Sequence, residues 1–163
     1  MGNDEMFRFF QQLGAAGLIK GSYIGTDATN AGYINSTSAG INVPEARQNG
    51  YAYNTRWQGR LAGSTQRFGG NLGHYIQYFY APAITTGAAN VGAFTMTPAD
   101  MLRFDTKFDD GLPGTGMINS WKGDGTTTFC TTAAGVAPPG DAGATYNLSD
   151  TNQDCGIFWL RVF

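Results

Sequence analysis

Apolar positions near the start of the chain recur at three- and four-residue steps, the spacing of one helical face. They are Met6, Phe9, Phe10, Leu13, Ala16 and Gly17. This pattern predicts a helix from Asp4 to about Lys20, which Gly21 ends as a residue suited to a left-handed conformation. Phe7 and Leu18 extend the apolar surface beyond one face, so we expect the helix to contact a second partner besides its own domain.

The pattern after this helix favours β structure. Gly, Ser, Thr, Asn and Tyr dominate residues 22 to about 70, which predicts a long irregular region with one or two short strands within Tyr51–Leu61. Aromatic and β-branched residues predict a strand at His74–Tyr80, ended by Pro82, and Thr85–Phe94 is expected to form a loop. Further strands are expected at Met117–Lys122, Phe129–Thr132 and Ile157–Phe163.

A second, short helix is predicted from the chemistry of its first turn. Thr97 is a capping residue, Pro98 suits the first helical position, and Asp100 stands three residues after the cap. Gly111 and Pro113 are expected to end the helix. The elements together predict an α+β fold, in which the first helix packs on a small antiparallel sheet and the second is inserted.

Composition places the chain in a broad class without naming a function. A length of 163 residues with 42% apolar residues is enough for one domain over residues 1–163 with one core. Charged residues make up only 13% and glycine is abundant, a mixture typical of loop-rich, extracytoplasmic β structure. The net charge of -2 gives no overall basic field for nucleic acid, and no run of about 18 apolar residues predicts a membrane span in these residues.

The chain has two cysteines, Cys130 and Cys155. An even pair in a chain of secreted-type composition predicts one disulfide. The alternative is two free thiols in a cytosolic protein. A zinc site is not expected, because His74 is the only histidine and it cannot complete four ligands with two cysteines.

Asp105, Asp109 and Asp110 place three carboxylates near the end of the short helix. A calcium site is one interpretation, although the spacing of these acids does not follow an EF-hand loop. A structural turn, in which Lys107 pairs with one of the acids, is the other interpretation. Since acids near a helix C-terminus are unfavourable, we expect some partner for them in either case.

Asp150, Asn152 and Asp154 match the first three oxygen positions of a calcium loop more closely. The glycine of that motif comes one residue late, as Gly156, and no glutamate closes the loop. The segment is therefore a weak calcium candidate. A turn held by side-chain hydrogen bonds is the alternative.

Positive and aromatic residues are interleaved between residues 45 and 70. The arginines are Arg47, Arg56, Arg60 and Arg67, and the rings are Tyr51, Tyr53, Trp57 and Phe68. This mixture suits single-stranded nucleic acid, bound by stacking and charge, or a glycan bound on aromatic rings. An ordinary variable loop is the competing interpretation.

No catalytic constellation is complete. The one histidine, His74, falls in a predicted strand, and no nucleophile-elbow or triad pattern surrounds the serines. The glycines of residues 69–73 lack the lysine and the following helix of a phosphate loop. We therefore expect a protein that is not an enzyme and needs no cofactor.

Two stretches of the sequence carry a family resemblance. The first is the helix-end run Phe7–Leu13 followed by Ala16–Tyr23, and the second is Thr97–Gly116, which precedes Cys130, Tyr146 and Cys155. With them the chain resembles the type IV pilins and the pseudopilins of type II secretion, proteins with a prepilin-type cleaved N-terminus. The resemblance implies the pilin fold, with residues 22–70 as the αβ-loop and a C-terminal region closed by the Cys130–Cys155 disulfide.

The resemblance also implies a function and a location. It implies a structural subunit of a pilus or secretion filament, whose partners are further copies of itself or related pilins. It implies a place in the periplasm or on the cell surface, with inner-membrane anchoring before assembly. The alternative is a minor tip pilin or adhesin that binds DNA or a glycan through the 45–70 loop.

One hallmark of the family is not found in this sequence. Pilins carry a cleaved leader and an apolar segment with an early glutamate, whereas Glu5 follows a polar stretch and does not correspond to that glutamate. We therefore expect this chain to be a head whose membrane-spanning half of the N-terminal helix, about 25 apolar residues, lies outside the given sequence.

Overall fold

The computed structural model describes residues 5–26, 39–48, 50–61, 68–80, 95–123, 129–133 and 143–160. The chain divides into two compact units, here called unit 1 (residues 1–56 and 78–92) and unit 2 (residues 57–77 and 93–163). Strands β1 (Tyr51–Leu61) and β2 (Gly70–Tyr80) each have residues in both units. The single domain expected from the sequence stays a prediction.

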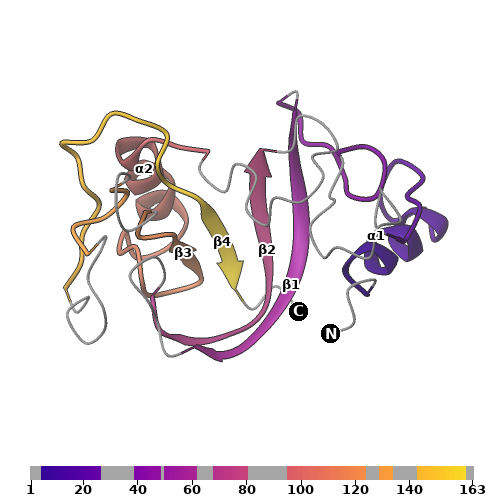
Figure 1. Ribbon diagram of the computed structural model, residues 1–163, viewed down its shortest axis with the longest axis horizontal. Coiled ribbons are helices and arrows are strands. Elements are labelled where there is room, and N and C mark those ends of the chain that lie inside the picture. The colour runs from indigo at the N-terminus through magenta and orange to yellow at the C-terminus, as the bar shows by residue number, and fades with distance from the viewer. Residues whose placement is uncertain are drawn as a thin grey trace. The chain divides into compact units, whose positions relative to one another are not determined.

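The fold is α+β, as the sequence predicted. The described residues form two helices and one four-stranded antiparallel sheet. The other elements are α1 (Glu5–Ala15), α2 (Pro98–Phe108), β3 (Ile118–Ser120) and β4 (Ile157–Leu160), shown in Figure 1. The strand order is β1-β2-β4-β3, so the last strand of the chain lies between two earlier ones. The C-terminal region is therefore an integral part of the sheet.

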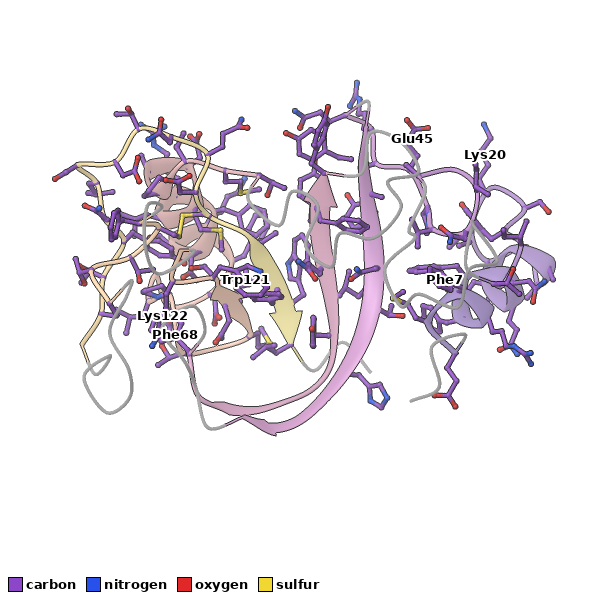
Figure 2. The ribbon with its side chains drawn as sticks, in the orientation of Figure 1. Phe7, Lys20, Glu45, Phe68, Trp121 and Lys122 are labelled. Atoms are coloured by element: carbon purple, nitrogen blue, oxygen red, sulfur yellow. A yellow bond between two sulfur atoms is a disulfide. The ribbon has the colours of Figure 1, made fainter. Side chains whose placement is uncertain are left out.

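Helix α1 contributes one apolar face to the core of unit 1. Met6, Phe7 and Phe10 are buried in a cluster that also contains Ala52 of β1 and Phe79 of β2. Phe7 is completely buried and points from α1 into this cluster (Figure 2). The expectation that Phe7 marks a second apolar side of the helix is therefore wrong, because its side chain completes the single buried face.

The end of α1 comes five residues earlier than predicted. Ala15 is its last residue, and Gly17 has a positive φ of 69°, which L side chains rarely adopt. The amide of Leu18 then donates to the Leu13 carbonyl at 3.0 Å. A glycine in this conformation ends the helix, so Gly17 rather than Gly21 terminates it, and Leu18 lies beyond the helix.

The strands of the hairpin are longer than the sequence predicted. Strand β1 takes up the whole of Tyr51–Leu61, and β2 begins at Gly70 instead of His74. Residues 70–73 have low strand propensity, but pairing with a neighbouring strand overrides a weak local preference. The irregular region expected up to residue 70 is correspondingly shorter, and the predicted loop at Thr85–Phe94 lies outside the described residues.

The predicted cap of α2 is confirmed. Thr97 Oγ1 accepts a hydrogen bond from the Asp100 amide at 3.1 Å and donates to the Asp100 carboxylate at 2.9 Å. Pro98 stands at the start of the helix, where its missing N–H costs nothing. The helix ends at Phe108, and the Asp109 amide donates to the Asp105 carbonyl at 2.7 Å.

Strands β3 and β4 pair in an antiparallel register that opposes Ile118 to Trp159 and Ser120 to Ile157. Directly opposed residues share a face, so these four lie on one side of the pair. On the other side Phe158 and Leu160 form a buried cluster with Tyr75 and Trp121. Both sides of β4 are thus covered, which suits its apolar sequence.

Two other predicted strands are shorter or missing. The expected strand Met117–Lys122 is limited to Ile118–Ser120. The expected strand Phe129–Thr132 is wrong, because Thr131 forms only an isolated bridge with Tyr146 and a turn follows at residues 132–133. The final strand, expected at Ile157–Phe163, is described from Ile157 to Leu160. Residues 161–163 lie outside the described residues.

Candidate functional site

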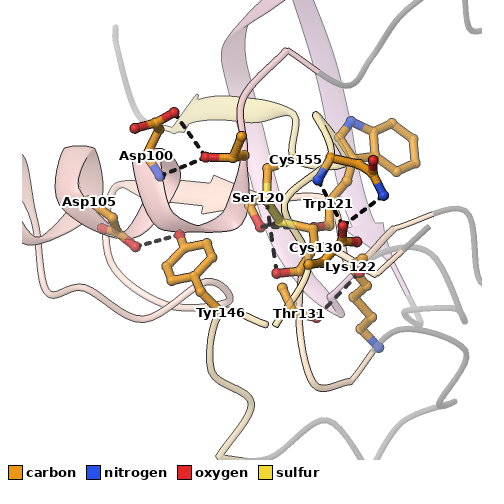
Figure 3. Close-up of a disulfide and its surroundings, with 12 residues drawn as sticks. Asp100, Asp105, Ser120, Trp121, Lys122, Cys130, Thr131, Tyr146 and Cys155 are labelled. Atoms are coloured by element: carbon orange, nitrogen blue, oxygen red, sulfur yellow. Dashed lines mark hydrogen bonds between the residues drawn. A yellow bond between two sulfur atoms is a disulfide. The ribbon is translucent and has the colours of Figure 1, made fainter. Parts of the chain in front are cut away.

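Cys130 and Cys155 form a disulfide, as predicted, with their Cα atoms 4.8 Å apart (Figure 3). Both residues are completely buried. The backbone of Cys155 pairs with Met96, just before α2, and the Cys130 carbonyl accepts from the Asn147 amide at 2.9 Å. The disulfide therefore joins three segments of unit 2. Because disulfides persist in oxidising compartments, it indicates an oxidising, extracytoplasmic environment.

A buried carboxyl lies next to the disulfide region. Asp105 on α2 is fully buried, and its Oδ2 accepts a hydrogen bond of 2.7 Å from the Tyr146 hydroxyl (Figure 3). Its Oδ1 accepts from the Gly111 amide at 3.3 Å. Burial raises the pKa of Asp105 from 3.8 to about 6, although the hydrogen bonds from Tyr146 and Gly111 act in the opposite direction. Burial also raises the pKa of Tyr146, which keeps its hydroxyl a donor.

The other two acids of this set organise the turn after α2. Asp109 Oδ2 accepts from the amides of Met117 and Ile118, the second at 2.7 Å. Asp110 accepts from the Leu112 amide at 2.8 Å and from the Thr115 hydroxyl. These donors are the partners that acids at a helix C-terminus were expected to need.

The three carboxylates of Asp105, Asp109 and Asp110 do approach one another, with one oxygen from each within 4.8 Å. Their backbone and hydroxyl donors support the structural turn, and the calcium reading stays a prediction. Lys107 was expected to pair with one of them, but its ammonium lies 5.3 Å from the ring centroid of Phe108. The ion-pair detail of that reading is therefore wrong, and the turn itself is supported.

The weak calcium candidate is a turn held by side-chain hydrogen bonds. Asp150 Oδ1 accepts from both the amide and the side-chain nitrogen of Asn152, each at 2.9 Å. The amide hydrogen bond from Asn152 is the main cause that lowers the pKa of Asp150. Asp154 is buried. Because Asn152 presents its nitrogen to Asp150, this arrangement matches a structural turn better than a set of oxygen ligands.

The arginines of the predicted binding loop are only partly described. Arg47 is exposed in the bend before β1. Arg56, Trp57 and Arg60 are residues of β1, but the structure describes only their backbone, and Arg67 lies outside the described residues. That these cations gather into one site stays a prediction.

Phe68, one of the interleaved rings, has a structural role. Its side chain is buried, and the ammonium of the completely buried Lys122 lies 5.0 Å from its ring centroid (Figure 2). A methyl group added at Gly114 would overlap the same ring. A buried cation over an aromatic face is a stabilising contact, so Phe68 is not available to stack on a ligand.

The hairpin instead brings together four tyrosines, which we call the tyrosine ladder: Tyr51, Tyr53, Tyr78 and Tyr80. Tyr51 stacks on Tyr78 with centroids 5.2 Å apart and an interplanar angle of 15°. The sequence pointed to the two members on β1 and missed the two on β2. Both pairs alternate at period two, so the register of the hairpin was the missing information.

A second group of rings lies on unit 2. We call Phe104, Phe108 and Trp159 the α2 aromatic cluster. Phe104 is 4.8 Å from Phe108 and 5.8 Å from Trp159, measured between ring centroids. Phe108 is 54% exposed, so part of this cluster faces solvent.

Comparison with protein-family models, with curated proteins and with solved structures finds no significant match for this chain. The pilin resemblance therefore remains an expectation from the sequence.

Within the described residues, neither helix is long and apolar enough to cross a membrane. His74 is exposed on β2, and the expectation that the protein is not an enzyme stays a prediction.

Proposed function

We propose that this chain is the extracytoplasmic head of a filament subunit, either a pilin or a pseudopilin. The observation that supports it is the position of the last strand. Strand β4 begins two residues after Cys155 and lies between β2 and β3. An N-terminal helix, an antiparallel sheet and a disulfide-closed C-terminal region in this order are what the family resemblance implies.

The physical demands on such a head agree with its construction. Disulfides persist outside the cytoplasm, and a crosslink that restricts the unfolded chain adds stability there. Cys130 and Cys155 provide this crosslink at a completely buried position. The protein then needs no cofactor and performs no catalysis, since its role is mechanical.

Filament assembly also requires a surface that contacts another copy. Repeated head-to-tail contacts that do not close produce a helical polymer. The α2 aromatic cluster is suited to such a contact, because aromatic residues are enriched in interfaces and Phe108 is more than half exposed. Its partner in this proposal is a second copy of the chain or a related pilin.

The proposed location follows from the same role. The head lies in the periplasm or on a surface filament, and the subunit is anchored in the inner membrane before it is assembled. The disulfide supports an oxidising compartment. The more specific placement rests on the family resemblance.

Electron microscopy of cells that express the natural gene tests the proposal. Antibodies against the folded head are expected to label fibres, or deletion of the gene is expected to abolish a secretion filament. Phe108→Ser should reduce fibre number several-fold, whereas Leu148→Ser, at a residue of unit 2 that is 58% exposed, should not. Uniform label on cells without fibres, together with unchanged secretion after deletion, would contradict the proposal.

A further inference from the structure

The rings of the tyrosine ladder form a continuous series across the hairpin. In spatial order they are Tyr53, Tyr78, Tyr51 and Tyr80, and the successive ring centroids lie 5.4, 5.2 and 5.0 Å apart. Distances of this size are those of rings in contact. Two strands thus supply alternate rings to one series, all within unit 1.

The ladder lies on the side of the hairpin that does not face α1. Ala52 and Phe79, each adjacent in sequence to ladder residues, belong to the buried cluster of α1. Successive side chains of a strand point to opposite faces, so the tyrosines point away from that cluster. Tyr80 is 39% exposed, and Tyr53 and Tyr78 are half-buried, so these three rings keep accessible surface. Tyr51 is buried and supports its neighbours in the series.

Polar groups border the rings. The Tyr78 hydroxyl donates to Gln48 Oε1 at 3.1 Å, and both residues are accessible there. The Gln48 segment is held beside the ladder, since the Tyr51 amide donates to the Gln48 carbonyl at 3.1 Å and the Ala46 amide to the Tyr51 carbonyl at 2.7 Å. Phenol hydroxyls and a carboxamide therefore supply both donors and acceptors.

Among the residues that the structure describes, the charges next to this border balance. Glu45 and Arg47 are both exposed, on either side of the buried Ala46, so the described segment contributes one negative and one positive charge. Binding to a phosphate backbone needs several cations that release counterions. Neutral ligands with many hydroxyl groups need none, and they can use the ring faces and the polar border together.

We propose that the three accessible rings of the tyrosine ladder (Tyr53, Tyr78 and Tyr80) and Gln48 bind an uncharged oligosaccharide. The apolar C–H faces of sugar rings pack on the open tyrosine rings, and sugar hydroxyls exchange hydrogen bonds with the phenol hydroxyls and the Gln48 carboxamide. Tyrosine supplies such contact area with little loss of side-chain freedom, because it has only two rotatable bonds. The site does not depend on filament assembly, so it can be measured on the purified chain.

Calorimetric titration of the purified chain with neutral oligosaccharides tests the site. The probes are cellohexaose, chitohexaose and mannohexaose, with a single-stranded DNA 20-mer as comparison, each at 50 and 300 mM salt. Binding of at least one sugar, with an affinity unchanged by salt, is the expected result. Tyr80→Ala should weaken it about tenfold or more, as loss of a stacked ring does in other aromatic sites.

Two further variants make the test specific. Tyr78→Phe keeps the ring and removes the hydroxyl that donates a hydrogen bond to Gln48. A smaller, two- to fivefold loss of sugar affinity is therefore expected. Ile41→Ala alters a residue of unit 1 that is 41% exposed, and it should leave sugar affinity unchanged. Circular dichroism of each variant confirms that the fold is intact.

Several results would overturn the inference. They are no binding of any of the three sugars, equal losses for Tyr80→Ala and Ile41→Ala, or binding of the DNA alone with an affinity that falls as salt rises. Dimerisation in size-exclusion chromatography that Tyr80→Ala abolishes, without sugar binding, would assign the ladder to a protein contact instead. None of these results depends on whether fibres form, so the filament proposal is tested separately.

Discussion

The Tyr146 hydroxyl donates a 2.7 Å hydrogen bond to the carboxylate of Asp105, across 41 positions of sequence. Asp105 belongs to α2, and Tyr146 lies in the segment enclosed by the disulfide. The same tyrosine forms a backbone bridge with Thr131. This one side chain therefore connects the helix to the disulfide-closed region, and several consequences can be measured.

Tyr146→Phe should lower the free energy of unfolding by about 2 kcal/mol near neutral pH, the range for a hydrogen bond to a charged group. The ring stays in place, so the loss of unfolding free energy comes from the missing hydroxyl and from the Asp105 carboxylate, which has one donor fewer. Urea denaturation of both proteins measures the difference. Tyr53→Phe, on the accessible ladder, is the matched control and should change stability by less than about 0.5 kcal/mol.

Stability should also fall as the pH rises between about 4 and 6. The pKa of Asp105 is raised from 3.8 to about 6 in the folded protein, so in this window the folded state holds a proton that the unfolded state has released. The slope of unfolding free energy against pH is then negative for this group. A pKa shift of this size corresponds to a loss of unfolding free energy of at most about 3 kcal/mol. The loss is complete above pH 6.

Asp105→Asn isolates this contribution because an amide does not titrate. The difference in stability between wild type and Asp105→Asn should change across pH 4 to 6 and stay constant above and below it. In Tyr146→Phe the upper end of the window should move to higher pH, because the lost hydrogen bond favoured the charged carboxylate. The lower end, set by the unfolded chain, should stay near pH 4. A difference curve without any slope between pH 4 and 6 would show that Asp105 titrates normally.

Local features of the fold were predictable from the sequence, and relations between distant segments were not. The cap at Thr97 needs only residues within one turn, so Thr97, Pro98 and Asp100 were sufficient to predict the start of α2. The end of α1 was placed wrongly, because Gly17 and Gly21 both take a positive φ and the earlier of the two ends the helix. Sequence alone does not choose between them.

The candidate sites show the same limit more strongly. The pairing of Tyr51 with Tyr78 depends on the register between β1 and β2, which the alternation of residues within each strand does not determine. Lys122 was placed in a strand, and its burial over Phe68 depends on packing between segments more than 50 residues apart. The disulfide was predictable because only two cysteines exist to be joined.

Removal of the disulfide should be costly. Cys130 and Cys155 are 25 positions apart, and the chain-entropy model gives about 3–4 kcal/mol for a closed loop of this size. The double variant Cys130→Ala with Cys155→Ala should therefore show a lower urea midpoint. The wild-type protein should approach the same urea midpoint in the presence of reductant, because unfolding exposes the disulfide to reduction.

Alkylation provides the check on this prediction. Mass spectrometry counts the alkylating labels on each chain. Because both cysteines are completely buried, the native protein should take up no label without reductant. Denaturant and reductant together should give two labels per chain. In denaturant without reductant the disulfide should still leave the chain unlabelled, and two labels under that condition would contradict it.

The cap of α2 makes a smaller, separable contribution. Thr97→Ala should lower the free energy of unfolding by about 1 kcal/mol, because it removes the acceptor of the Asp100 amide. Thr97→Ser keeps the hydroxyl and should restore most of the loss, which chemical denaturation can measure. If alanine and serine destabilised the protein equally, packing of the threonine methyl group rather than capping would be responsible.

The burial of Phe7 decides what the apolar residues of α1 do. Phe7 has no exposed surface, whereas Leu18 is 72% exposed. Phe7→Ala should therefore cost about 3–5 kcal/mol by urea denaturation, the range for truncating a buried phenylalanine. Leu18→Ala should change stability by less than about 0.5 kcal/mol. A small effect of Phe7→Ala in the isolated chain would mean that this side chain is not needed for the head's own core, and the apolar face of α1 would again be available to a second partner.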